Sequence, residues 1–300
     1  MDRACPWSGE ALIRLFAAVL TCVMIGSWAG LLTREGPGAV PSRVLWLAVP
    51  GLLGLIAALA FTLQQWTWER FRRQLIGFSV TFYLGLICLS VAHQWAGPAE
   101  RPSGYRQVVW AGLSFQGAAL ILITRFLHQH GTTWSDAFGL RVRPGRALLL
   151  GLAAGCAVLP AAWALQLLSM AVLQQLNLPA DVQVAVQVLQ ETTDWRRQLG
   201  LAVVALVLAP PAEEALFRGL LFGTLHRAGR PRLAWIGTTL LFALVHANAA
   251  SFPALVLLAL LLTWLYRQTA NLLAPIAAHA VFNALNFLAV QFYQQTWAGP

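Results

Sequence analysis

The chain has 300 residues, of which 58% are hydrophobic and only 10% are charged, and its formal net charge is +9. Soluble domains carry about 25% charged residues, so this composition excludes an ordinary soluble protein and indicates a polytopic membrane protein. All twenty basic residues are arginines, mostly at the ends of apolar runs where they act as topology signals, so we expect no nucleic-acid partner.

Nine apolar runs are candidate membrane helices, and together they predict an all-α bundle with eight or nine spans. The runs are continuously apolar rather than alternating, which favours helices over a β-barrel. The runs at 232–247 and 253–266 are short, which leaves open whether they cross the membrane fully. The nine runs cover residues 11–32, 44–63, 75–96, 108–127, 147–173, 199–225, 232–247, 253–266 and 272–292.

The arginines also predict an orientation. With nine spans and a cytoplasmic N-terminus, most loop arginines fall on the cytoplasmic side, so we predict the N-terminus inside and the C-terminus outside. Arg3 and Arg14 flank a short polar stretch before an apolar run to Leu32, in the manner of a signal peptide, but the length of this run and the later spans favour a retained helix. The Ala-, Leu- and Arg-rich composition indicates a GC-rich bacterial genome, so the expected location is the bacterial inner membrane.

Two regions differ in the polar residues inside their spans. Residues 1–146 hold four predicted spans with no carboxylate in the middle of any of them. Residues 147–300 hold five predicted spans and the polar side chains suited to catalysis. We therefore predict an N-terminal accessory region, 1–146, and a catalytic helical core, 147–300.

The most unusual stretch lies within the apolar run from Leu199 to Leu225, where Pro210-Pro211-Ala212 precedes two glutamates. An ionisable group at membrane depth costs roughly 2.5–3.5 kcal/mol on the insertion scale and usually marks a functional site. Glu214 and Arg218 are four residues apart, which predicts an ion pair on one helix face. Glu213 points elsewhere, so we expect it to face a polar cavity and to handle protons or a metal.

Polar residues also occur on two later runs. His246 ends the run that contains Phe242, and His279 and Asn283 lie one turn apart on the last run. Taken singly, His246 is a helix-end residue, and His279 with Asn283 is an interhelical hydrogen-bonding pair worth about 0.6–2 kcal/mol. Taken with Glu213, they are the residue types that polarise a water molecule and stabilise an oxyanion.

The sequence leaves the cofactor open. The zinc motif HExxH is absent. Glu213, His246 and His279 on separate helices could hold a divalent ion such as zinc with one open position. In the alternative, the site has no metal, and Glu213 and His246 activate the water directly.

Three motifs follow in order on successive apolar runs: Glu-Glu-x-x-x-Arg at 213–218, Phe-x-x-x-His at 242–246 and His-x-x-x-Asn at 279–283. They resemble the motifs of the CPBP intramembrane proteases, which include the type II CAAX prenyl endopeptidases and the bacterial Abi-type proteins. The resemblance covers roughly residues 145–292. It implies a membrane-embedded endopeptidase, often described as a metalloprotease, on an all-helical fold.

The resemblance also implies roles for the motif residues. Glu213 and His246 would activate the attacking water, and His279 and Asn283 would stabilise the oxyanion. Glu214 belongs to the same catalytic set. Arg218 and Phe242 would support it.

We therefore predict an intramembrane endopeptidase whose partners are membrane lipid and a hydrophobic or lipidated peptide. A bacterial source makes a prenylated terminus an unexpected substrate. One alternative is a non-catalytic membrane scaffold or immunity-type protein, in which the motif residues are structural. Another is an ion-coupled transporter with Glu213 on a proton path, although the two halves of the chain show none of the repeat typical of many transporters.

Overall fold

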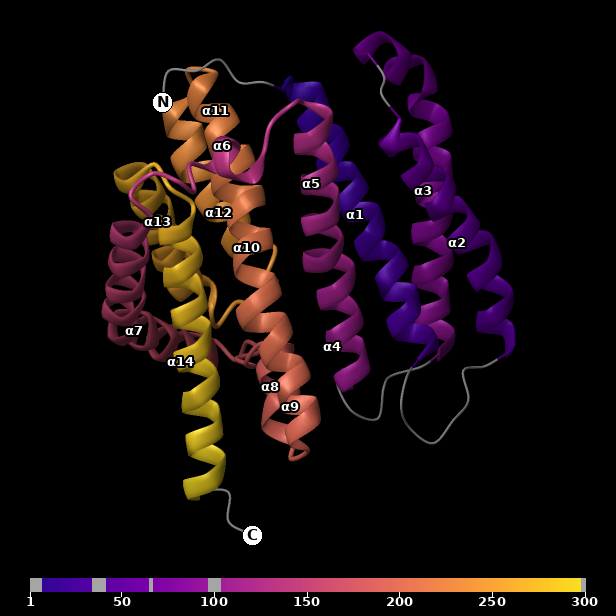
Figure 1. Cartoon of the computed structure of the whole chain (residues 1–300). Coiled ribbons are helices and arrows are strands. Elements are labelled where there is room, and N and C mark those ends of the chain that lie inside the picture. Colours follow the sequence, from indigo (N-terminus) through magenta and orange to yellow (C-terminus); the bar gives the residue numbers. More distant parts are fainter. Residues whose placement is uncertain (1–6, 34–41, 65–66, 97–103, 298–300) are drawn as a thin grey trace. The chain divides into compact units, whose positions relative to one another are not determined.

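The computed structural model describes residues 7–33, 42–64, 67–96 and 104–297, and every regular element in these ranges is a helix (Figure 1). The prefix η marks π-helical segments, in which an N–H bonds the carbonyl five residues earlier. In chain order the elements are α1 (Gly9–Leu32), α2 (Ser42–Leu63), α3 (Trp68–Ala96), α4 (Tyr105–Gly112), η1 (Leu113–Gly117), α5 (Ala118–Gln129), α6 (Trp134–Phe138), α7 (Pro144–Gln175), α8 (Val184–Glu191), α9 (Trp195–Ala202), η2 (Val203–Leu208), α10 (Ala209–Glu214), η3 (Ala215–Phe222), α11 (Gly223–Arg227), η4 (Leu233–Gly237), α12 (Thr238–Leu244), α13 (Phe252–Thr269) and α14 (Leu273–Trp297).

Within these ranges, eight helices are long and apolar enough to cross a membrane, which confirms the predicted all-α polytopic bundle. The chain is a multi-pass integral membrane protein. The eight helices cover Gly9–Leu32, Arg43–Leu63, Arg72–Trp95, Tyr105–Gln129, Pro144–Gln175, Trp195–Arg227, Phe252–Thr269 and Leu273–Phe292.

The predicted span at 232–247 is shorter than expected. Its apolar helix covers only Leu233–Leu244. The helix is capped at Val245, and the chain then turns at Ala247, whose φ of 48° is left-handed. Residues 1–6 and 298–300 lie outside the described ranges, and the cytoplasmic N-terminus stays a prediction.

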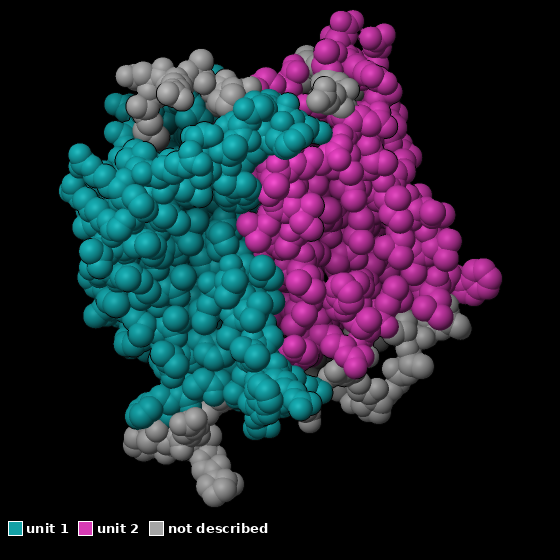
Figure 2. Space-filling model, in the orientation of Figure 1, with its two compact units in different colours: residues 1–6, 127–300 teal, residues 7–126 magenta. Residues whose placement is uncertain are grey.

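The chain forms two compact units, residues 7–126 and the part from residue 127 onward (Figure 2). In the first unit, α2 packs against α1 and α3 through glycines. A Cβ at Gly51 would lie 2.8 Å from the Trp28 ring, and one at Gly54 would lie 2.7 Å from the carbonyl oxygen of Thr81. Such close backbone approach is how helices associate where lipid removes the hydrophobic driving force. The predicted division at residue 146 separates an accessory region from a catalytic core, and it stays a prediction.

In the second unit, α7 packs closely against α14. A Cβ at Gly155 would lie 2.6 Å from the carbonyl oxygen of Ala278 and 3.0 Å from its Cα. The backbone of α14 therefore rests directly on a glycine of α7. Ala278 precedes His279, so this contact helps to fix where the histidine lies.

The start of α14 is fixed by Asn271, which is fully buried. Its Oδ1 accepts a hydrogen bond from the backbone N–H of Leu273 (2.8 Å), as the side chain of a helix-capping residue does. Its Nδ2 donates to the carbonyl oxygens of Leu140 (3.3 Å) and Val142 (2.8 Å). One side chain thus ties the chain before α7 to the beginning of α14.

We predict that Gly155→Ala destabilises the protein by roughly 1–3 kcal/mol, because the new methyl group overlaps backbone atoms that cannot rotate away. Gly145→Ala in the same helix is the matched control, since a Cβ there meets nothing within 4 Å. Thermal unfolding in detergent measures both. Equal midpoints for the two variants would contradict the close α7–α14 contact.

Candidate active site

The candidate site is built around one interrupted helix, residues 195–227. Pro210 and Pro211 in α10 have no N–H and so remove two donors from the helical ladder. The N–H of Ala209 bonds the carbonyl of Val204, five residues back, which is the π-helical register. A second π segment, η3, follows α10 at once. The helix is therefore locally widened on both sides of Glu213 and Glu214, and π-bulges of this kind are frequent at functional sites.

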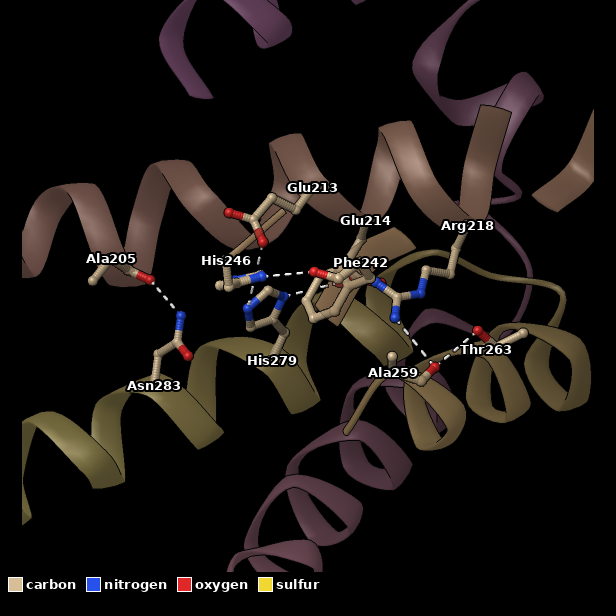
Figure 3. A network of polar contacts seen from close by, with 10 residues as sticks. All are labelled: Ala205, Glu213, Glu214, Arg218, Phe242, His246, Ala259, Thr263, His279 and Asn283. Carbon is tan, nitrogen blue, oxygen red and sulfur yellow. Dashed lines mark hydrogen bonds and ion pairs between the residues drawn. The ribbon is translucent and has the colours of Figure 1, made fainter. Parts of the chain in front are cut away.

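Glu214 is the centre of the polar contacts (Figure 3). Its Oε1 accepts from Arg218 Nη1 at 2.9 Å and from His279 Nδ1 at 2.9 Å. All three residues are buried, with Glu214 at 0% and Arg218 at 1% exposure. The predicted pair between Glu214 and Arg218 thus forms, and the same oxygen also holds a side chain of α14.

Arg218 makes two further contacts that hold its charge in a buried place. Its Nη2 donates to the carbonyl oxygen of Ala259 in α13 at 3.1 Å. Its Cζ lies 4.4 Å from the ring centroid of Phe242, within the range of a cation–π interaction. The guanidinium is thereby shared among three elements, η3, α12 and α13.

Phe242 is the common neighbour of the two histidines. It is fully buried, and its ring centroid lies 4.9 Å from that of His246 and 5.8 Å from that of His279. It also packs edge-on against Phe217 at 5.3 Å. The aromatic ring therefore fixes the position of both imidazoles relative to the glutamate helix (Figure 3).

His246 is half-buried, in the turn that follows α12, and the structure indicates its tautomer. Its Nδ1 lies 2.7 Å from the carbonyl oxygen of Phe242. Because a carbonyl oxygen only accepts, Nδ1 must carry the hydrogen. In the neutral ring, Nε2 is then the basic nitrogen, so His246 can take up a proton there.

Glu213 and Glu214 approach opposite nitrogens of the same imidazole. The Oε2 of Glu213 lies 4.0 Å from His279 Nε2, while Glu214 bonds Nδ1. Glu213 is 5% exposed, so this carboxylate is also buried. A carboxylate, an imidazole facing it and a second imidazole against the same phenyl ring are groups that can pass protons to and from a bound water.

Asn283 has a different partner. Its Nδ2 donates to the backbone carbonyl of Ala205 in η2 at 2.9 Å. The amide lies one turn beyond His279 on α14, as Figure 3 shows. The structure thus gathers six of the seven predicted residues around Phe242 and Glu214, and it engages Asn283 with the helix backbone before the prolines.

Glu213, His246 and His279 are the residues predicted as possible metal ligands. Among the described residues, no cluster of three or more His, Cys, Asp or Glu side chains is arranged to hold an ion. His279 meets Glu214 at one nitrogen and Glu213 at the other, so the two carboxylates lie on opposite sides of its ring. A metal held by these three side chains stays a prediction.

Two backbone carbonyls in the network had no place in the sequence analysis. That of Ala259 accepts from Arg218 and also from Thr263 Oγ1 at 2.9 Å. An alanine carbonyl carries no sequence signal, so this contact could not have been found. That of Ala205 could have been suspected, because Pro210 lies five residues further on and cannot donate to it.

Comparison with known families finds a match in the region that contains these residues. Residues 195–285 match the family described as Type II CAAX prenyl endopeptidase Rce1-like. This part of the chain is a domain of the Rce1-like, CAAX-type protease (CPBP) family. The domain runs from the start of α9 to the middle of α14, and all three motifs lie inside it. No curated protein and no solved structure matches the chain.

We predict that Arg218→Leu destabilises the CPBP domain by about 3–5 kcal/mol, because it leaves the buried carboxylate of Glu214 without its cation. Glu214→Gln in the Arg218→Leu background should recover part of this loss, since the neutral amide oxygen still accepts from His279. Chemical unfolding in detergent measures the cycle. Additive losses in the double variant would contradict the charge pairing.

Proposed function

We propose that the chain is an intramembrane endopeptidase that hydrolyses a peptide bond of a membrane-associated, hydrophobic or lipidated substrate. The observation that carries this proposal is the buried contact of Glu213 and Glu214 with His279 inside a CAAX-type protease domain. Membership of a protease family implies a protein or peptide substrate. Buried ionisable groups in a membrane helix are expensive and are generally kept for function.

In the proposed reaction, Glu213 and His246 activate a water molecule. The carboxylate of Glu213 or the Nε2 of His246 takes one proton from the water as its oxygen attacks the carbonyl carbon of the substrate. The carbonyl π bond opens and its electron pair moves to oxygen, giving a tetrahedral intermediate with one oxyanion. The buried setting strengthens each of these electrostatic contacts.

His279 and Asn283 then stabilise and resolve the intermediate. His279 acts in its doubly protonated form, in which Nδ1–H donates to Glu214 and Nε2–H donates to the oxyanion, and an amide N–H of Asn283 donates to the same oxyanion. When the carbonyl re-forms, the C–N bond breaks, and the proton held by Glu213 or His246 passes to the leaving amine. The products are a carboxylic acid and an amine, so one water is consumed and all protons are accounted for.

Glu214, Arg218 and Phe242 hold this arrangement in place. The Nδ1 contact with Glu214 fixes the ring of His279, and Phe242 fixes both imidazoles. We further propose that the protein lies in the bacterial inner membrane with a cytoplasmic N-terminus. Residues 1–146 would act as an accessory region, and a zinc-type metalloprotease variant of the site stays open to test.

We predict that Glu213→Gln abolishes peptide cleavage while the folded state is retained. The amide keeps the shape of the side chain but cannot take the proton from water. Cleavage is measured on purified protein in liposomes, with a mixed library of hydrophobic and lipidated fluorogenic peptides.

Glu191→Gln is the matched control, because it neutralises an exposed carboxylate of the same compact unit. Each variant is tested with and without chelator, and loss of cleavage on chelation would assign a role to a metal. Wild-type rates for Glu213→Gln would overturn the proposed role of Glu213. Absence of cleavage by the wild type, together with a markedly lowered melting temperature for Glu213→Gln, would favour a non-catalytic scaffold.

A separate prediction concerns His246. Replacement by Gln removes the basic Nε2 and should lower kcat on the order of 10²- to 10⁴-fold, with little change in KM. The thermal midpoint should shift little, because the half-buried ring makes a single hydrogen bond to its own turn. A rise in KM with unchanged kcat would instead assign His246 to substrate binding.

A further inference from the structure

The proline pair leaves several carbonyls of the glutamate helix short of donors. In an α-helix, the carbonyls of residues 205, 206 and 207 would accept from the N–H groups of residues 209, 210 and 211, and of these three residues only Ala209 has an N–H. That N–H is used by Val204. In the π-helical register, the next carbonyl, Ala205, would pair with residue 210, which is proline. Neither position that would pair with Ala205 in an α or π register, 209 or 210, therefore supplies it with a donor.

Asn283 supplies the missing donor. Its Nδ2 lies 2.9 Å from the Ala205 oxygen, and because a carbonyl can only accept, the NH2 group of the amide must face it. One turn earlier on the same helix, His279 bonds Glu214. These two side chains of α14 therefore hydrogen-bond the glutamate helix on either side of its two prolines (Figure 3).

We propose that Pro210 is a positioning residue for Asn283. Pro210 has no N–H to donate to the Ala205 carbonyl, so this carbonyl is free to accept from the amide of Asn283. The resulting hydrogen bond fixes the Asn283 side chain one turn from His279. The amide has two N–H groups, and the bond to Ala205 uses one. The other N–H remains as the oxyanion donor, and this last step rests on the proposed function.

A double-variant cycle in the full-length protein tests the coupling by stability alone. Asn283→Leu leaves the Ala205 carbonyl without a donor and should lower the melting temperature by about 3 °C or more. In the Pro210→Ala background, Ala205 gains a backbone donor, so the same change should lower it by less than half as much. An equal loss in both backgrounds overturns the inference, as does an unchanged melting temperature for Asn283→Leu.

Pro211→Ala is the matched control for this cycle. Its restored N–H would reach the carbonyl of residue 206 or 207, not that of Ala205, so Asn283→Leu should remain fully destabilising there. The inference also requires that a new donor at position 210 is compatible with the fold. If neither Pro210→Ala nor Pro210→Ser folds, the inference fails.

Cleavage kinetics test whether Pro210 positions Asn283 for catalysis. With the peptide library, Pro210→Ala should lower kcat about tenfold with KM nearly unchanged, because the amide is no longer fixed, whereas Pro211→Ala should match the wild type. Equal kcat values for Pro210→Ala and Pro211→Ala overturn the inference that Pro210 positions Asn283 for catalysis. Stability coupling without any cleavage by the wild type contradicts the proposed function and leaves the link between Pro210 and Asn283 supported.

Discussion

The oxygen Oε1 of Glu214 accepts from a guanidinium and an imidazole at the same time, in a place that water does not reach. A buried carboxylate is tolerable only when opposite charge and hydrogen bonds offset its desolvation. Arg218 supplies the charge from the next helical turn, and α14 supplies the second donor. The positions of η3 and α14 are therefore tied to each other by one atom, and the contacts of Phe242 and Ala259 build outward from it.

The close packing of small residues makes this arrangement possible. Gly155 allows the backbone of α14 to rest on α7, and Asn271 fixes where α14 begins. His279 is thus placed by contacts on both sides before its own hydrogen bond is counted. In a membrane, where lipid is as apolar as the core, such packing and polar links replace the hydrophobic effect as the source of specificity.

Much of this could be predicted from the sequence, because it depends on local spacing. The helical repeat places Glu214 and Arg218 on one face, and continuous apolar runs identify the membrane helices. The short helix before His246 was less predictable, because the sequence carries no Gly or Pro signal for the turn that follows it at Ala247. Phe242 was predicted as a supporting residue, but its contacts with His279 and Arg218 could not be foreseen, because they arise from packing among segments distant in sequence. The hydrogen bond from Asn283 to Ala205 was partly predictable. The prolines indicate that a backbone donor is missing, but they do not indicate which side chain replaces it.

The two donors on Glu214 come from positions very different in the order of synthesis. Arg218 follows four residues later, but His279 follows 65 residues later, on the last helix described. The nascent chain therefore has its carboxylates long before it has the imidazole that completes the set. On the proposed function, a partly inserted chain has no assembled site, so the protein would stay inactive until its final helix has entered the membrane.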